Sequence, residues 1–467
     1  MTIPALPSLV RAGALLLALC PLLPAQEEGS GAEEPVPEPA AAEQPAAEER
    51  PPAGRYLAVT GATVHTITDG TLLEATVLCK DGRILKVGRE VAVPEGAEVI
   101  DARGMHVYPG LIAVNASGIA PGGQRLQDNL DPFSRNLGLA LAGGLTCVQE
   151  GGVVARLSWG RLEGTLAAIL PWVNLSYSTT NPSNRRRLRA SLGRAREYLR
   201  QVRAHELAKA RGEKDLEEPS DKGLDKNHLA LLKGEKVARF SAHSMKDLLG
   251  ICDLLEAFPM RAVIFGGREA WTVADRLGRS GAFLVIEPRS KQWPDEERNA
   301  PSGWSIENAR ILYEAGVPFA LLPAMGGYGS GQHIDLGGIA GRDLQTLPME
   351  AAFAMRGGLP QEAALRAITL DAARILGVED LLGSLEPGKY ADLIVTDGDL
   401  LDYRTFVQWA VVDGRVVYDK QEMPWFAHIR PRPAPRLEEV AQELLEELAE
   451  PEEDAESRDP DAPEGDG

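Results

Sequence analysis

Cysteine and histidine are both scarce in this chain of 467 residues. The four cysteines, Cys20, Cys79, Cys147 and Cys252, are widely scattered, which excludes a disulfide framework. Cys147 and Cys252 lie in apolar segments and are predicted to be buried as small hydrophobic side chains. The seven histidines are dispersed, and nothing in their spacing brings them together at one site.

Positive charge is also in deficit, with 49 Lys and Arg residues against 68 Asp and Glu residues and a net charge of −19. Nucleic acid and anionic membrane surfaces both require a basic face, so we expect neither as a partner. The apolar run from Ala12 to Leu23 is too short to span a bilayer, so no transmembrane span is expected.

The N-terminal residues have the pattern of an export signal. Arg11 precedes the apolar run, and Leu23-Pro24-Ala25 offers a cleavage point before Gln26. Residues 1–25 are therefore predicted to be a signal peptide, and residues 26–54, rich in Glu, Pro and Ala, a disordered tether. Leu19 precedes Cys20 where a lipid anchor requires a small residue, so we expect a periplasmic or extracellular protein without this anchor.

Two β-rich segments flank the middle of the chain. Residues 55–106 and 379–420 contain short alternating runs with turn signals at Asp81-Gly82 and Asp413-Gly414. Together they predict one composite β-domain built from both ends of the chain.

Between them, residues 107–378 alternate short apolar runs with helical patterns, which is typical of repeated βα units. An eight-stranded barrel is the natural closure of such units, although only seven strands can be recognised. The predicted strands are 107–114, 145–149, 166–170, 237–241, 262–265, 283–286 and 319–322. The predicted helices are 245–257, 269–277, 305–315 and 360–376.

Residues 183–235 are predicted to be a helical insertion. Its many arginines allow a nucleic-acid-binding arm, but the acidic stretch from Asp215 to Asp221 offsets them, which favours a solvated helix. Residues 421–467 are predicted to be an acidic tail with one helix at about 437–448.

Two common catalytic motifs are missing. The Gly-rich segment Gly326–Gly331 lacks the Lys-Ser/Thr ending of a phosphate loop, and its neighbourhood is better interpreted as a lid. There is no Gly-x-Ser-x-Gly nucleophile elbow.

Five stretches resemble the amidohydrolase superfamily, in particular its imidazolonepropionase-like branch. They are VIDARGMHVYPGLI, GGLTCVQEGG, LYEAGVPFALLPA, LPQEAALRAITLDAARILGVED and GSLEPGKYADLIVTDGDLLD. The resemblance covers about residues 56–420. It implies an α/β fold, a (β/α)8 TIM-like barrel with a composite β-sandwich domain.

The resemblance also implies one or two divalent metals, such as zinc, that activate water against a carbon–nitrogen bond. The positions that match the metal ligands carry other residues. On strand one, the two expected histidines are replaced by Asn115 and Ser117. The strand-five position carries Phe265 or Gly266, and the strand-six position carries Glu287-Pro288. On the last strand, the expected Thr-Asp pair is replaced by Pro323-Ala324. Only Lys236 is near the strand-four position. We therefore expect no metal cofactor.

Six residues remain as pocket candidates at the predicted barrel mouth: Asn115, Ser117, Glu150, His243, Glu287 and His333. The loops that carry His243, His333, Asp335 and Glu150 could also bring these four residues together as a new active site. The alternative for His243 is a hydrogen bond at the start of a helix, beside Ser244.

Three functions stay open. The first is an exported amidohydrolase-fold protein with a degenerate metal site, inactive, that binds a small ligand or pairs with itself or an active paralogue. The second is an active hydrolase on non-peptide carbon–nitrogen bonds through a rearranged or metal-free site. The third is a structural protein of the cell envelope.

Overall fold

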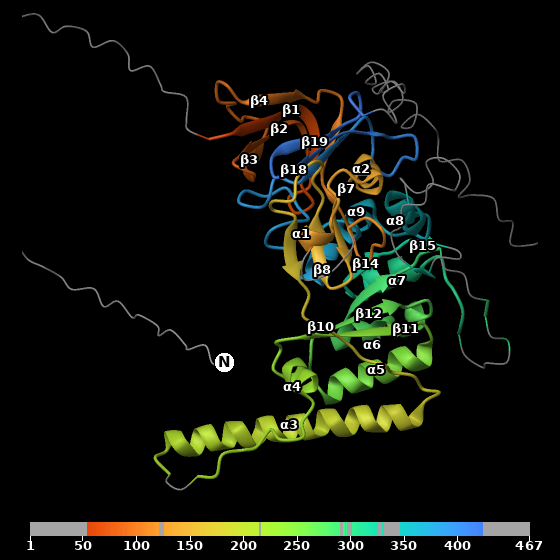
Figure 1. The fold of residues 1–467 in the computed structure, drawn as a ribbon. Coiled ribbons are helices and arrows are strands. Elements are labelled where there is room, and N and C mark those ends of the chain that lie inside the picture. The colour runs from red at the N-terminus through yellow and green to blue at the C-terminus, as the bar shows by residue number, and fades with distance from the viewer. Residues whose placement is uncertain are drawn as a thin grey trace, which may run out of the picture. The chain divides into compact units, whose positions relative to one another are not determined.

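The computed structural model describes residues 54–120, 126–213, 216–289, 293–294, 296, 301–325, 329–330 and 346–423 (Figure 1). The predicted signal peptide, nearly all of the predicted tether, the C-terminal helix and His333 lie outside these residues.

The strands are β1 (Tyr56–His65), β2 (Thr71–Lys80), β3 (Arg83–Gly88), β4 (Glu98–Asp101), β5 (His106–Pro109), β6 (Leu111–Ala113), β7 (Leu145–Glu150), β8 (Val153–Arg156), β9 (Leu166–Ile169), β10 (Trp172–Asn174), β11 (Val237–Ala242), β12 (Ala262–Gly266), β13 (Phe283–Ile286), β14 (Phe319–Leu321), β15 (Ala324–Met325), β16 (Gly329–Ser330), β17 (Leu393–Thr396), β18 (Val407–Val412) and β19 (Arg415–Asp419). The helices are α1 (Leu126–Asn129), α2 (Arg135–Ala142), α3 (Pro182–Ala210), α4 (Lys226–Leu232), α5 (Met245–Ala257), the 3-10 helix η1 (Ala270–Val273), α6 (Ala274–Ser280), α7 (Asn308–Glu314), α8 (Thr346–Arg356), α9 (Gln361–Ala367) and α10 (Leu370–Leu376).

Strands from both ends of the chain share one mixed sheet (Figure 1). Its order is β19-β18-β17-β5-β1-β2-β3, with β4 also paired to β1. β1 is long enough to pair antiparallel with β2 on one edge and parallel with β4 and then β5 on the other. The strands are therefore joined by hydrogen bonds into a single sheet, rather than the two sheets of the predicted sandwich.

The predicted strand 107–114 is two strands that belong to different sheets. β5 pairs with β1 and β17, whereas β6 pairs with β7. Gly110 separates them, and a Cβ atom there would lie 1.9 Å from Oγ1 of Thr146. Only glycine permits this close approach of the two sheets.

A second sheet has the order β6-β7-β8-β9. Only Gly151 and Gly152 separate β7 from β8, and so short a connection requires an antiparallel hairpin. β9 then returns antiparallel to β8. The run 166–170 is consequently a hairpin strand and not the barrel strand that the sequence predicted.

A third sheet, β10-β11-β12-β13-β14, is entirely parallel. Its first strand is β10, which the sequence did not indicate. Helices α5, α6 and α7 lie between successive strands of this sheet in the chain, as expected for βα units, and α5 has its predicted bounds.

These two sheets do not close by hydrogen bonds into the predicted eight-stranded barrel within the described residues. The β7–β8 hairpin takes the place of a βα crossover, which interrupts the parallel order. The sheets nevertheless bury one common apolar cluster, to which β6, β7 and β8 contribute Ile112, Cys147 and Val154, and β12 and β13 contribute Val263 and Val285.

Helix α10 and the residues before it cover the space between β6 and β14. The predicted helix 360–376 is broken at Thr369, whose backbone is not helical (φ −133°, ψ −94°) and whose Oγ1 donates to the carbonyl of Leu365 over 2.6 Å. The break frees the carbonyl of Ile368, which accepts a hydrogen bond from the amide of Ile112 at 3.0 Å.

The predicted insertion contains α3 and α4. α3 begins at an Asn181 cap with Pro182 in its first turn and buries only Leu188, Leu192 and Ala195, one face of a helix of 29 residues. No helix in the described part of the chain is both long enough and apolar enough to cross a membrane.

One buried ion pair joins the second sheet to the composite sheet. The guanidinium of Arg156, at the end of β8, donates to both carboxylate oxygens of Asp392 over 2.8 and 2.6 Å. Both side chains are buried. Burial alone would lower the pKa of Arg156, but the charge and hydrogen bonds of Asp392 outweigh it, so the pKa of Arg156 is raised.

We predict that Asp392→Asn lowers the free energy of unfolding by about 3–5 kcal/mol, because the Arg156 charge stays buried without its counter-ion. Urea titration followed by circular dichroism measures the change. The double variant Arg156→Met/Asp392→Leu is expected to recover part of the loss, since neither charge remains.

Asp101→Asn is the matched control, because Asp101 pairs with Arg103 at the exposed end of β4. Equal destabilisation by Asp392→Asn and Asp101→Asn would show that the buried pair does not hold the sheets together.

Candidate functional site

Five of the six residues selected from the sequence lie at the carboxyl ends of strands β6, β7, β11 and β13. This is the end of α/β sheets and barrels at which ligands bind. Asn115 and Ser117 follow β6, Glu150 ends β7, His243 follows β11, and Glu287 follows β13. The sixth, His333, is outside the described residues.

The backbone after β6 is fixed to β7 by Gln149. The amide of Asn115 donates to Oε1 of Gln149 over 2.9 Å, and the amide of Ala116 donates to its carbonyl over 2.7 Å. Asn115 takes a left-handed conformation (φ 59°), which asparagine tolerates better than most residues. Asn115 is half-buried and Ser117 is exposed, so both side chains can be reached from solvent.

The carboxylate of Glu150 holds the loop that follows. It accepts hydrogen bonds from the amides of Gly118, Ile119 and Ala120 at 2.8, 3.1 and 2.8 Å. Consecutive amides that converge on one carboxylate form an anion-holding nest. Glu150 is thereby engaged as a structural anchor rather than presented as a base or a metal ligand.

His243 is bound to an arginine. Its Nδ1 accepts a hydrogen bond from Nε of Arg268 over 3.0 Å, so the neutral ring carries its proton on Nε2. Burial lowers the pKa of His243 and Arg268 lowers it further, while Glu287 acts in the opposite direction. His243 therefore presents an N–H donor, and the expected bond at the helix start is made by Ser244 instead, whose Oγ accepts from the amide of Asp247.

Glu287 is the second group that faces His243. Glu287 is only 7% exposed, and its negative charge raises the pKa of His243. Its carboxylate is therefore near enough to the imidazole for the two groups to act on the same ligand.

The sequence did not single out Glu269, which is fully buried beside this pair. Its carboxylate accepts from the amides of Met245 and Gly303 over 2.7 and 3.0 Å. It thus joins the start of α5 to the segment before α7. In the sequence, only the position of Glu269 after β12 and next to Arg268 could have suggested that it joins these two segments.

A catalytic zinc needs about three protein ligands, and among the described residues at these strand ends several donors already have other partners. His243 is engaged by a guanidinium, Glu150 by backbone amides, and Phe265 packs edge-on against Trp172 with ring centroids 5.9 Å apart. A Cβ atom on Gly266 would lie 2.4 Å from Cε1 of His243, so the ring fills the space of any side chain there. Within the part of the chain that the structure describes, no three His, Cys, Asp or Glu side chains are grouped to hold a metal ion.

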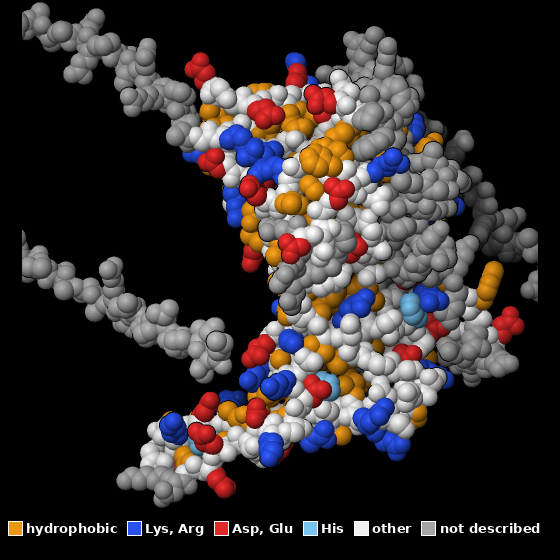
Figure 2. Space-filling model, viewed as in Figure 1, with side chains coloured by type: hydrophobic (Ala, Val, Ile, Leu, Met, Phe, Trp, Pro, Cys, Tyr) orange, Lys and Arg blue, Asp and Glu red, His pale blue; other side chains and the backbone are white. Residues whose placement is uncertain are grey.

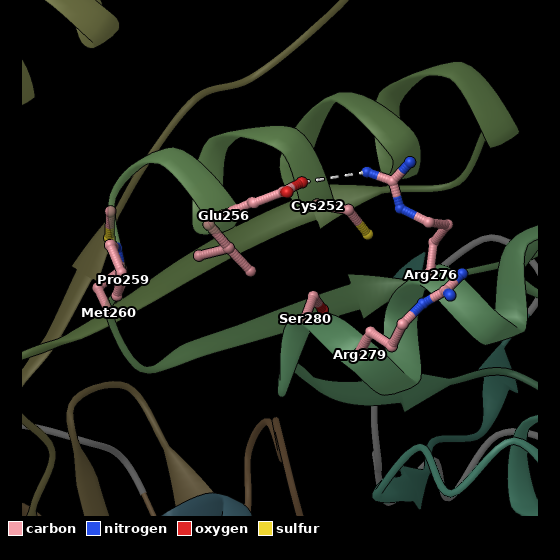
Figure 3. Close-up of a pocket in the computed structure, with 8 residues that line it drawn as sticks. Cys252, Glu256, Pro259, Met260, Arg276, Arg279 and Ser280 are labelled. Carbon is pink, nitrogen blue, oxygen red and sulfur yellow. Dashed lines mark ion pairs between the residues drawn. The ribbon is translucent and has the colours of Figure 1, made fainter.

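A cavity of about 650 Å³ lies elsewhere, between α5 and α6 (Figure 3). Cys252, Met260 and Ser280 are among its lining residues, and Arg276 forms an ion pair with Glu256 across 3.5 Å at its edge. Met260 and Ser280 immediately precede β12 and β13, so the cavity is at the amino ends of the strands. Burial raises the pKa of the Cys252 thiol, which disfavours the thiolate form.

We predict that Glu150→Gln accelerates hydrogen exchange at the amides of residues 118–120 and lowers the free energy of unfolding by about 1–3 kcal/mol, because three donors lose a charged acceptor. Hydrogen-exchange mass spectrometry measures the exchange rate of the amides in this loop directly. Glu163→Gln, an exposed carboxylate, is the control; unchanged exchange in Glu150→Gln would contradict the anchoring role.

Residues 285–423, from β13 to the end of the composite sheet, match the model of the amidohydrolase family. A segment of 66 residues, 11% of this chain, is 42% identical to a 5-methylthioadenosine/S-adenosylhomocysteine deaminase from Symbiobacterium thermophilum. Another of 75 residues, 16% of this chain, is 37% identical to a dihydroorotase from Aquifex aeolicus. The matches span only 15% and 17% of these two proteins.

The fold as a whole is similar to the crystal structure of an amidohydrolase from Thermotoga maritima MSB8. The TM-score is 0.58 at 24% identity, and the match covers 78% of this chain and all of that one. The chain therefore has a mixed α/β fold similar to that of this amidohydrolase, and residues 285–423 match the amidohydrolase family model.

Proposed function

We propose that this protein binds a small organic molecule at the carboxyl ends of β6, β7, β11 and β13 without a divalent metal. The hydrogen bond from Arg268 to His243 is the observation that carries this proposal. It occupies one imidazole nitrogen and places a permanent positive charge beside His243.

Electrostatics support the same proposal. A divalent cation within a few ångströms of a guanidinium is repelled by several kcal/mol at the effective dielectric constant of about 20 that applies near protein surfaces. An uncharged polar ligand has no such penalty. The N–H of His243 and the carboxylate of Glu287 can receive the carbonyl and N–H groups of an amide-like molecule.

We further propose, as the N-terminal sequence suggests, that the protein acts after export. A partner role is part of this proposal, either with a second copy of the chain or as an inactive subunit beside an active relative.

An active hydrolase is the second candidate, and the family match favours it, together with the buried carboxylate of Glu287. In this case Glu287 would take a proton from water as the water oxygen attacks the carbonyl carbon of a carbon–nitrogen bond. The carbon–nitrogen bond would then break as Glu287 passes that proton to the leaving nitrogen. The N–H on Nε2 of His243 would donate to the carbonyl oxygen as negative charge develops there.

The test uses the purified full chain. Metal is measured by inductively coupled plasma mass spectrometry, and both binding and hydrolysis are measured with dihydrouracil and related cyclic amides. We expect substoichiometric zinc, saturable binding that Glu287→Gln weakens, and no hydrolysis. Glu314→Gln, an exposed carboxylate on α7, is the control and should bind as the unmodified chain does.

About one equivalent of bound zinc, with hydrolysis that a chelator abolishes, would overturn the proposal. Hydrolysis that survives the chelator but is lost in Glu287→Gln would establish the second candidate instead.

A further inference from the structure

A cavity of about 440 Å³ opens where β10 ends and α3 begins. Its volume is within the range of small-molecule sites, and it lies beyond the carboxyl end of a parallel strand. The lining residues are Asn174, Leu175, Ser176, Asn184, Arg187, Leu188, Ala190, Ser191, Arg194 and His228. None of them belongs to the candidate site above, and none is acidic in a chain with a large excess of acidic residues.

One face of α3 supplies the charge. Arg187, Ser191 and Arg194 are spaced by four and three residues, so their side chains project on the same side of the helix. The start of α3 is fixed to the strand end, because Nδ2 of Asn184 donates to the carbonyl of Ser176 over 2.8 Å. Figure 2 shows Lys and Arg side chains gathered along α3 at the lower edge of the molecule.

The two arginines have no counter-ion. Neither Arg187 nor Arg194 forms an ion pair or hydrogen bond with the described residues, whereas Arg200 on the same helix pairs with Glu197 over 2.9 Å. No acidic residue lines the cavity, and the nearest carboxylate to its imidazole is Asp225, whose Oδ2 lies 3.8 Å from Nδ1 of His228. Two cations at a cavity with this lining raise its affinity for anions.

Further donors surround the same space. Oγ of Ser191 and Nδ1 of His228 are 2.7 Å apart, which fixes the imidazole of α4 at the cavity. On the strand side, Oδ1 of Asn174 accepts from Nη1 of Arg239 over 3.2 Å, and this guanidinium lies 4.3 Å from the ring of Phe265. Nε of Arg239 is buried without a hydrogen-bond partner.

We propose that this cavity binds a small phosphate-bearing molecule. Arg187 and Arg194 are seven residues apart, about 10.5 Å along the helix axis, so they approach a ligand from two directions. Donors that come from two helices and a strand end suit the several oxygens of a tetrahedral anion. A planar carboxylate is better matched by the two parallel donors of a single guanidinium.

The test titrates the full chain with inorganic phosphate at constant ionic strength and follows binding by isothermal titration calorimetry. We expect saturable one-site binding that Arg187→Gln and Arg194→Gln each weaken about tenfold, the loss of one charge-assisted contact. Arg203→Gln on the same helix, outside the lining residues, is the matched control and should leave the affinity within about twofold.

Three results would overturn the proposal: no saturable phosphate binding by the intact chain, equal weakening in Arg203→Gln, or an affinity for acetate equal to that for phosphate. The thermal unfolding temperature of each variant shows whether weaker binding comes from a lost contact or from an unfolded protein. The result is also independent of zinc content and hydrolysis, so this inference can fail while the proposed function stands.

Discussion

The buried contact between Arg156 and Asp392 is the constraint on which the arrangement of the sheets depends. The guanidinium comes from the hairpin of the second sheet and the carboxylate from the segment just before β17. Asp392 also accepts the amide of Asp413 at 2.9 Å, and Arg156 lies 3.8 Å from the ring of Tyr390. Residues more than two hundred positions apart in the chain are therefore held in contact, which joins the second sheet to the composite sheet.

The strand ends themselves are occupied largely by contacts within the protein. Glu150 holds a loop, Gln149 fixes the turn after β6, and Glu269 joins two loops. The side chains of these residues accept hydrogen bonds from backbone amides. These bonds stabilise the loops, but the side chains are then not free to act as catalytic groups or ligands. Among the described candidates, Asn115 and Ser117 are open to solvent, whereas His243 lies between the charges of Glu287 and Arg268.

Much of this fold can be predicted from the sequence, because the parallel strands and helix α5 are continuous apolar or amphipathic segments between clear turn signals. The composite sheet follows from two β-rich ends with turns at Asp81-Gly82 and Asp413-Gly414. The hairpin at Gly151-Gly152 was missed because a buried antiparallel strand has the same apolar composition as a barrel strand. The short β10 has too few residues for any periodicity to appear.

The candidate site could be predicted only in part. Strand ends can be located from sequence, so the five described candidate residues could be assigned to the carboxyl ends of strands. Their partners cannot be inferred, since the bond from Arg268 to His243 and the amides around Glu150 depend on loop conformation. The cavity beside α3 was similarly hidden, because the arginines of a solvated helix and those of an anion site have the same spacing.

Nitrogen-15 NMR of the His243 ring, recorded on the full chain before and after excess zinc is added, tests the central claim most directly. We expect a neutral ring with its proton on Nε2, a hydrogen-bonded Nδ1, and no change when zinc is added. A shift of either ring nitrogen on zinc addition, with loss of the Arg268 hydrogen bond, would contradict it.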